Sequence, residues 1–158
     1  MPPITALLHT ENDALRLGRA LETLRPCDEI LVVDHGSHDA TTHTACEYGA
    51  RILSAGRSLS HYLQSARHDW ILCLEPREAL TEALEASLYQ WKSAAPPLVS
   101  GQAFSVYLRE ETPGGWISLP SPQVRLVPRG WSRWQDHFPA GDASALTLEG
   151  ELLRFLLP

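Results

Sequence analysis

The stretch that decides the fold runs from Ile30 to Asp39 and reads ILVVDHGSHD. Its first four residues are apolar and mostly β-branched, which is typical of a strand covered on both faces of a parallel sheet. The next six residues form a turn rich in glycine and short polar side chains. Asp39 stands where it can cap a following helix. The pattern therefore predicts a strand, a polar turn and a helix in immediate succession.

The same succession repeats on both sides of this stretch. Apolar runs at 4–8, 51–53 and 70–74 predict three further strands. Helices are predicted after Asn12 or Asp13, after Asp39, after Ser58 and over 82–91. Four strand–helix units in a row favour a mainly parallel sheet with helices on both faces, a three-layer α/β sandwich. We expect residues 1–95 to form this half.

The pattern changes in residues 96–158. Alternating residues at 104–108, a turn at 112–115 and an apolar run at 116–119 predict an antiparallel hairpin, and 123–127 predicts another strand. About 60 residues with this much proline would build a weak core alone. We therefore expect a trimmed, antiparallel extension of the same domain, so that residues 1–158 form one unit.

Composition narrows the class of partner. The chain has 158 residues, with 13 Lys and Arg against 19 Asp and Glu, a formal charge of −6. No basic run is present, which argues against binding a nucleic acid polymer. No apolar stretch approaches the roughly 18 residues that span a membrane, and the start lacks signal-peptide features. A cytoplasmic location is predicted, with the inner face of a membrane as a peripheral alternative.

The cysteines and the C-terminal segment carry smaller predictions. Cys27, Cys46 and Cys73 are widely spaced and form no CxxC pair, so reduced, buried thiols are expected. Residues 152–158 are dense in apolar side chains. They predict a last strand, a surface for homo-oligomer formation, or a membrane-facing edge.

Polar residues follow three of the predicted strands, at the edge where open parallel sheets bind ligands. They are His9, Thr10 and Glu11, the turn at 34–39, and the segment 75–78. Residues 30–41, ILVVDHGSHDAT, resemble the VVDxGSxDGT strand and turn of glycosyltransferase family 2. Residues 70–78, WILCLEPRE, resemble the family's WILFLDADE segment. Residues 123–130, QVRLVPRG, and Arg133-Trp134 resemble the QxRLFRRG and RW stretch of the lipopolysaccharide-core branch.

The resemblance implies a GT-A fold and the transfer of a sugar from a nucleotide-diphosphate donor to a hydroxyl of a cell-envelope glycan or lipid-linked glycan. It implies that Asp34 accepts hydrogen bonds from the nucleobase, which are strong for a charged acceptor. The implied nucleotide-sugar site comprises His9, Thr10, Glu11, Asp34, Gly36, Arg57, Glu75 and Arg77. On the acceptor side, Asp142 and His137 are the candidate catalytic residues for the general base.

Departures from the family pattern leave the function open. The family's Asp-Ala-Asp metal motif corresponds to Glu75-Pro76-Arg77, and a guanidinium repels the Mg²⁺ or Mn²⁺ that such a motif binds. We therefore assign no metal ligand and disfavour both ions. The family's Arg-Asn pair corresponds to Leu59-Ser60, and its His-Glu motif falls near 137–142 without a glutamate. One hypothesis is an enzyme in which Arg77 replaces the metal. The alternative is a catalytically silent domain that binds a nucleotide, a glycan or a partner protein.

Several side chains have a structural interpretation beside the functional one. Asp34 either belongs to a ligand site or satisfies its own turn, Asp39 is expected to cap a helix, and Arg77 alternatively pairs with Glu75 or Glu78. His35, His38 and His43 match no standard zinc spacing, so a polar surface turn is expected rather than a metal site. Trp116, Trp131 and Trp134 are expected in the core, with sugar stacking as the alternative.

Overall fold

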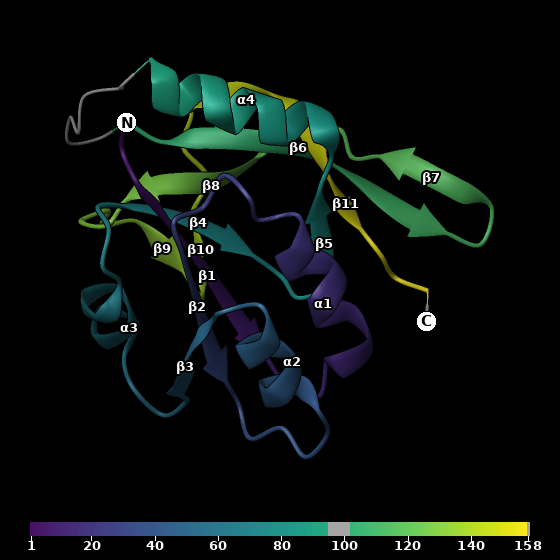
Figure 1. Ribbon diagram of the computed structural model, residues 1–158. Helices are drawn as coiled ribbons and strands as arrows, with labels where there is room; N and C mark the ends of the chain where they lie inside the picture. Colours follow the sequence, from purple (N-terminus) through teal and green to yellow (C-terminus); the bar gives the residue numbers. More distant parts are fainter. Residues whose placement is uncertain (95–101, 158) are drawn as a thin grey trace.

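One nine-stranded sheet runs through both halves of the chain in the computed structural model, which describes residues 1–94 and 102–157 (Figure 1). The order of its strands is β3-β2-β1-β4-β8-β6-β11-β5, and β7 pairs with β6 outside this path. A separate pair, β9 and β10, forms a small second sheet. The predicted boundary between the halves, at residues 95 and 96, lies outside the described residues.

The first half has the predicted alternation of strands and helices. Four neighbouring strands pair in parallel: β1 (Ile4–Thr10), β2 (Glu29–Asp34), β3 (Arg51–Ser54) and β4 (Trp70–Leu74). The helices between them are α1 (Ala14–Glu22), α2 (Thr41–Glu47) and α3 (Leu59–Ser65). The side chain of Ser58 accepts a hydrogen bond from the backbone N–H of His61, which confirms the predicted cap. The predicted fold class is confirmed.

The second half extends the sheet. The predicted hairpin is formed by β6 (Phe104–Thr112) and β7 (Gly115–Ser118), and the predicted strand at 123–127 is β8 (Gln123–Pro128). The C-terminal segment contributes to β11 (Leu146–Arg154), which pairs with β6 on one side and β5 on the other. The sequence pattern did not predict β5 (Glu78–Leu80), β9 (Trp134–Gln135) or β10 (Phe138–Pro139), because two or three residues are too few to show an alternation.

The connection from β4 to β5 forces the sheet to curl. Only residues 75–77 separate the two strands in the chain, yet three other strands lie between them in the sheet. A flat sheet would hold β4 and β5 about 19 Å apart. Four extended Cα–Cα steps reach only about 14 Å. The sheet must therefore bend until β5 approaches the carboxyl end of β4.

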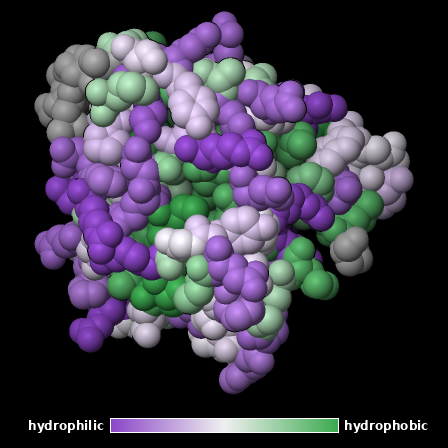
Figure 2. Space-filling model, in the orientation of Figure 1, coloured by the Kyte–Doolittle hydropathy of each residue, from purple (hydrophilic) through white to green (hydrophobic). Residues whose placement is uncertain are grey.

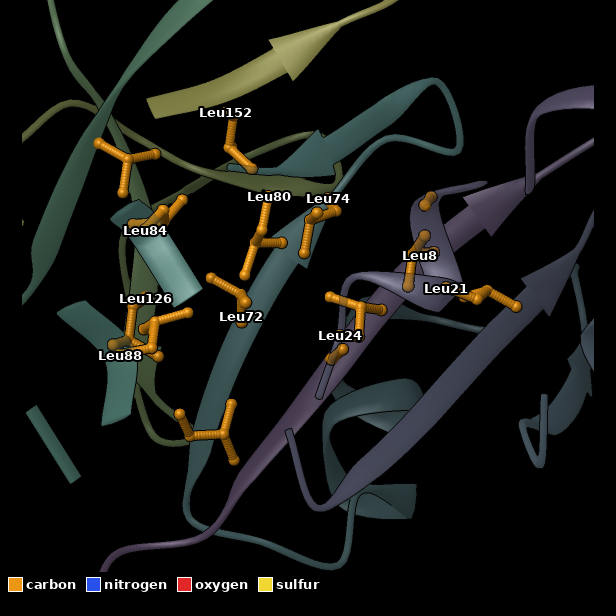
Figure 3. Close-up of a cluster of buried hydrophobic side chains, with 14 of the residues drawn as sticks. Leu8, Leu21, Leu24, Leu72, Leu74, Leu80, Leu84, Leu88, Leu126 and Leu152 are labelled. Atoms are coloured by element: carbon orange, nitrogen blue, oxygen red, sulfur yellow. The ribbon is translucent and has the colours of Figure 1, made fainter. Parts of the chain in front are cut away.

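Helices and loops cover the two faces of the sheet unequally. Helices α1, α2 and α4 (Glu82–Ser93) pack on one face, where their apolar side chains meet those of β1, β4, β6 and β8. Figure 3 shows the leucines of this layer, with Leu84 and Leu88 of α4 beside Leu126. On the other face, α3 and the β9–β10 hairpin cover a second cluster. The surface is mainly hydrophilic in Figure 2, with a hydrophobic patch near the centre of the view.

Some predicted side-chain environments need correction. Cys46 is exposed, whereas Cys73 is buried and Cys27 is half-buried, so the three thiols are not all buried as expected. Trp131 is buried and Trp134 packs against the second cluster, as predicted for core residues. Trp116 is wrong as a core residue, because 37% of it is exposed and its ring meets Phe155 edge-on. Among the described residues, no helix is both long and apolar enough to cross a membrane.

Gly150 allows β11 to approach α4 backbone against backbone. The hydroxyl of Thr81, which precedes α4, donates to the carbonyl of Glu151 at 2.7 Å and accepts from the N–H of Leu84. Gly150 has φ +94, and a Cβ there would lie 2.4 Å from the backbone nitrogen of Leu84. Neither backbone segment can move without breaking these bonds, so only glycine fits.

We predict that Gly150→Ala lowers the free energy of unfolding by about 2–4 kcal/mol, because it adds a backbone clash to an unfavourable φ. Gly49→Ala is the matched control: Gly49 has φ +77, but nothing lies within 4 Å of its added Cβ. This control should cost only about 1 kcal/mol. Urea denaturation measures both values. Equal losses in the two variants would show that the close approach to α4 does not constrain the fold.

Candidate functional site

The parallel pairing of β1 and β2 sets which side chains meet at the carboxyl edge. Thr10 is opposite Asp34, and the backbone N–H of His35 donates to the carbonyl of Thr10 at 2.8 Å. Because side chains alternate along a strand, His9 and His35 lie on the same face. That face also carries α3 and the β9–β10 hairpin. The register therefore brings the two histidines together beneath the hairpin.

His137 completes a cluster of three imidazoles. Nδ1 of His9 lies 3.0 Å from Nε2 of His35, and the ring of His137 stacks on that of His9 with centroids 3.8 Å apart. Tyr62 of α3 meets His9 edge-on. Burial, together with the charges that His137 and His35 could carry, lowers the pKa of His9 to about 3. His9 is therefore a neutral imidazole at physiological pH.

Asp34 is engaged with its own turn. Its carboxylate accepts from the hydroxyl of Ser37 at 2.5 Å and from the backbone N–H of the same residue at 3.1 Å. The side chain of Asn12 and the hydroxyl of Ser37 then join the turns after β1 and β2. Gly36, with φ +84, supplies the left-handed position in this turn. The structural interpretation of Asp34 has direct contacts, and its role toward a nucleobase stays a prediction.

The other residues at this edge have mainly local partners. Thr10 donates its hydroxyl hydrogen to Asp13 at 2.7 Å, and Glu11 is exposed. Ala40, rather than the predicted Asp39, is at the N-cap position of α2. Asp39, one residue earlier, accepts from the backbone N–H groups of Thr41 and Ala14, at the starts of α2 and α1.

Arg57 lies on the exposed loop between β3 and α3. Its backbone N–H donates to the hydroxyl of Tyr62 at 3.0 Å.

A buried ion pair fixes the segment after β4. The guanidinium of Arg125, on β8, makes two bonds to the carboxylate of Glu78, at 2.6 and 2.9 Å, and both side chains are fully buried. Arg125 also donates to the carbonyl of Cys73, and the ring of Phe138 covers its guanidinium. Burial alone would raise the pKa of Glu78, but the charge and hydrogen bonds of Arg125 outweigh burial and hold that pKa below its ordinary value.

Glu75 and Arg77 form the outer part of the same network. Arg77 Nε donates to Glu75 at 3.0 Å, and Arg154 of β11 pairs with Glu75 at 3.2 Å and with Glu78 at 3.1 Å. Arg154 also donates to Glu110 at 2.7 Å. The pairing of Arg77 with Glu75 was one of the two predicted alternatives. Sequence reasoning missed Arg125 and Arg154, although a charge inside the apolar run QVRLVP was a visible signal for Arg125.

A cleft of about 370 Å³ opens beside this network. Its lining combines Glu75, the start of β8 and both sides of the β9–β10 hairpin: Pro122, Gln123, Val124, Arg125, Gln135, Asp136, Phe138, Pro139 and Gly141. A larger, mainly apolar groove of about 670 Å³ lies along α3, and Leu59, Ser60, Trp131 and Trp134 contribute to its lining.

The two candidate bases lie in different surroundings. His137 is in the histidine cluster, whereas Asp142 is bound within its own loop by Ser144 and Arg133. Hydrogen bonds from Ser144, with the charge of Arg133, lower the pKa of Asp142. A carboxylate with a lowered pKa accepts protons less readily. In the part of the chain that the structure describes, Asp142 and His137 make no hydrogen bond or ion pair with each other.

The fold places the chain in a known structural class. Residues 1–349 of S. aureus TarS, in complex with UDP, match with a TM-score of 0.51 and 16% identity, over 75% of this chain and 38% of that chain. The crystal structure of a mycobacterial protein matches with a TM-score of 0.51 and 19% identity, over 70% of this chain and 42% of that one. At this identity the matches show the fold alone, which is the GT-A-like fold of glycosyltransferases.

Of two sequence relatives, one is named as a glycosyltransferase. No family model matches the sequence. The chain is 32% identical over 127 residues to a TPR repeat-containing protein of Synechococcus elongatus, covering 74% of this chain and 30% of that protein. It is 30% identical over 91 residues to an uncharacterized glycosyltransferase of Rickettsia prowazekii, covering 54% of this chain and 31% of that protein. The chain therefore spans less than a third of these curated relatives. Its fold is glycosyltransferase-like, and part of its sequence is similar to a protein named as a glycosyltransferase.

We predict that Glu78→Gln lowers the free energy of unfolding by about 3–5 kcal/mol at pH 7, because it leaves Arg125 buried without its counter-charge. Since the folded-state pKa of Glu78 is lowered, its contribution is complete above the unfolded pKa of about 4.3 and is lost as pH falls through the folded value. The difference between the parent and the variant should therefore narrow below about pH 4.

Glu85→Gln is the control for this prediction, because Glu85 pairs with Arg25, whose side chain is 65% exposed. That substitution should cost only about 0–1 kcal/mol. Chemical denaturation between pH 3 and pH 7 measures both series, and similar costs for the two variants would contradict a stabilising role for the buried pair.

Proposed function

We propose that this chain binds a nucleotide-diphosphate sugar at the carboxyl edge of β1, β2 and β4, and that it does so without Mg²⁺ or Mn²⁺. One observation carries the proposal. Glu75 stands where the family resemblance puts the first metal-binding aspartate, and it is paired with Arg77 and Arg154 instead. Hard divalent cations bind where several oxygen ligands converge, and two guanidinium groups oppose their approach.

Arg77 is the residue proposed to contact the diphosphate. Its side chain is 36% exposed, and that of its partner Glu75 is 25% exposed. Ion pairs at such exposed positions contribute only about 0–1 kcal/mol, so a ligand that carries more negative charge can displace the carboxylate. A guanidinium also matches a phosphate group with two parallel donors. Arg57, exposed on the loop after β3, is a second candidate for this contact.

Binding without turnover is the function that the contacts support best. Glu75, at the position of the family's metal motif, pairs with two arginines, and Asp142, a candidate base, is bound by Ser144 and Arg133, so both carboxylates already have partners. The partners in this proposal are the nucleotide sugar and, as a second ligand, a glycan or a partner protein. The degenerate DxD motif and the likeness to the lipopolysaccharide-core branch remain parts of the proposal.

A second candidate is a transferase in which Arg77 stabilises the leaving diphosphate. The stacked His137, beside the cleft that Asp136 and Phe138 help to line, favours it, because histidine is the side chain that most often serves as a general base. The acceptor would be a cell-envelope glycan or a lipid-linked glycan at the inner face of the membrane. Hydrolysis of a labelled donor, which transfers the sugar to water and releases it free, separates this candidate from a silent binder.

The unit that carries this function is proposed to be the whole of residues 1–158, since one sheet passes through both halves. Formation of a homo-oligomer through residues 152–158 also stays a prediction. β11 is already paired on both sides, which leaves apolar side chains after it, such as the 40% exposed Leu157, for that contact.

We predict that nucleoside diphosphates and their sugars raise the melting temperature of metal-stripped protein equally with and without added Mg²⁺. At a ligand concentration of about 100 Kd, stabilisation is about 2.7 kcal/mol. Differential scanning fluorimetry over uridine, guanosine, cytidine and thymidine diphosphates and their sugars identifies the donor class. A shift that requires Mg²⁺ contradicts the metal-free site, and no shift with any nucleotide contradicts nucleotide binding.

The substitution Arg77→Gln should weaken the identified nucleotide at least about tenfold, since it removes the charged hydrogen bonds to the diphosphate. Arg67→Gln is the matched control. Arg67 is also exposed and also pairs with a glutamate, Glu29. It precedes β4, however, and so lies at the amino end of the parallel strands, away from the proposed site. Isothermal titration of both variants tests the assignment, and equal weakening by the two would point to general charge rather than to Arg77.

A further inference from the structure

Three histidines from distant parts of the sequence converge beyond the network that surrounds Glu75. His9 is on β1, His35 follows β2, and His137 is in the turn between β9 and β10. One ring nitrogen of each lies within 4.8 Å of those of the other two. The hairpin thus closes a cluster that the pairing of β1 with β2 begins.

The facing ring nitrogens of His9 and His35 already have nearly the separation of two nitrogens that bind one metal ion. Nδ1 of His9 and Nε2 of His35 are 3.0 Å apart. Two imidazole nitrogens bound to one tetrahedral Zn²⁺, at bond lengths of 2.0–2.1 Å, are about 3.3 Å apart. Small rotations of the two rings would therefore bring both nitrogens to the separation that a bound metal ion needs. The ion would then take the place of the hydrogen bond between them.

His137 supplies the third ligand after a change of ring orientation. Its plane is inclined by only 16° to that of His9, and two stacked rings cannot both direct a lone pair at one ion. His137 is exposed on a two-residue turn, so its side chain can rotate. His9 is held from the other side by Tyr62, and its Nε2 is buried with no hydrogen-bond partner among the described residues. The inner ligand is thus fixed and the outer one is free to adjust.

We propose that His9, His35 and His137 form a binding site for a divalent transition metal of the Zn²⁺ class. Three neutral imidazoles suit Zn²⁺, Co²⁺, Ni²⁺ and Cu²⁺, whereas Mg²⁺ and Ca²⁺ prefer oxygen ligands. Three protein ligands leave a fourth position for water or a small ligand. The site is separate from the Mg²⁺-type site that the resemblance places at Glu75, and it does not depend on nucleotide binding.

Metal binding would connect the hairpin to the edge of the sheet. Without it, the contacts of the turn with that edge are the stack of His137 on His9 and its tilted approach to His35. The same hairpin contributes Gln135, Asp136 and Phe138 to the lining of the 370 Å³ cleft. An ion held by His137 would therefore set the shape of that cleft.

The test is a titration of EDTA-treated, desalted protein with ZnCl₂ by calorimetry, and with CoCl₂ by visible absorption. One equivalent of Zn²⁺ should bind, and bound Co²⁺ should give the intense visible bands of a four-coordinate site. His137→Ala and His35→Ala should each weaken Zn²⁺ by about tenfold to a hundredfold, the loss that even outer-shell changes cause at such sites. MgCl₂ in place of ZnCl₂ should produce no saturable binding.

His38→Ala and His43→Ala are matched controls on the same stretch of chain. Both histidines are exposed, and His43 pairs with Glu47 one helical turn away, which makes that pair the obvious competing site. Neither substitution should change the affinity. Melting of all variants without metal shows whether they are folded, and His137 is at an exposed turn where alanine should be tolerated. The proposal is overturned if Zn²⁺ does not saturate, or if His43→Ala weakens it while His137→Ala does not.

Discussion

The ion pair of Arg125 and Glu78 connects the middle of the sheet to the segment after β4 and to the β9–β10 hairpin. Arg125 comes from β8, bonds to the carbonyl of Cys73 on β4, and lies under the ring of Phe138 on β10. Glu78 begins β5 and also accepts from the backbone of Glu75 and from Arg154. A buried pair is expensive to break because either charge alone would remain without water or a partner. The segment after β4 and the β9–β10 hairpin therefore both rest in part on this pair, which lies at the end of the short connection that curls the sheet.

This dependence explains why the candidate site combines rigid and adjustable parts. The parallel strands fix His9, Asp34 and Leu74, the residue before Glu75, through backbone pairing. The hairpin with His137 rests on them mainly through side chains, by stacking and by the contact of Phe138 with Arg125. Ligand sites on such a scaffold can change their chemistry at the hairpin while the strands keep their register.

Local patterns predicted most of the fold. The apolar run 30–33, the cap at Ser58 and the glycine-rich turn at 112–115 each act over a few residues, so sequence alone was sufficient for β2, α3 and the β6–β7 hairpin. The histidine cluster was missed because His137 is more than a hundred residues from His9 along the chain. The expected order of the strands is enough to place His9 near His35. The short strands that position His137 leave no periodic signal in the sequence.

The mutual pairing of Glu75, Glu78, Arg77, Arg125 and Arg154 also constrains how this chain can evolve. Replacing Arg77 by aspartate would leave Arg154 on Glu75, and replacing Arg154 would leave Glu78 and Glu110 with one cation fewer. Each single step toward a cluster of carboxylates thus removes a partner from a charge that is partly or fully buried. Neighbouring sites in one network have strongly coupled energies. A cluster of carboxylates at this segment is consequently hard to reach by single, stepwise substitutions.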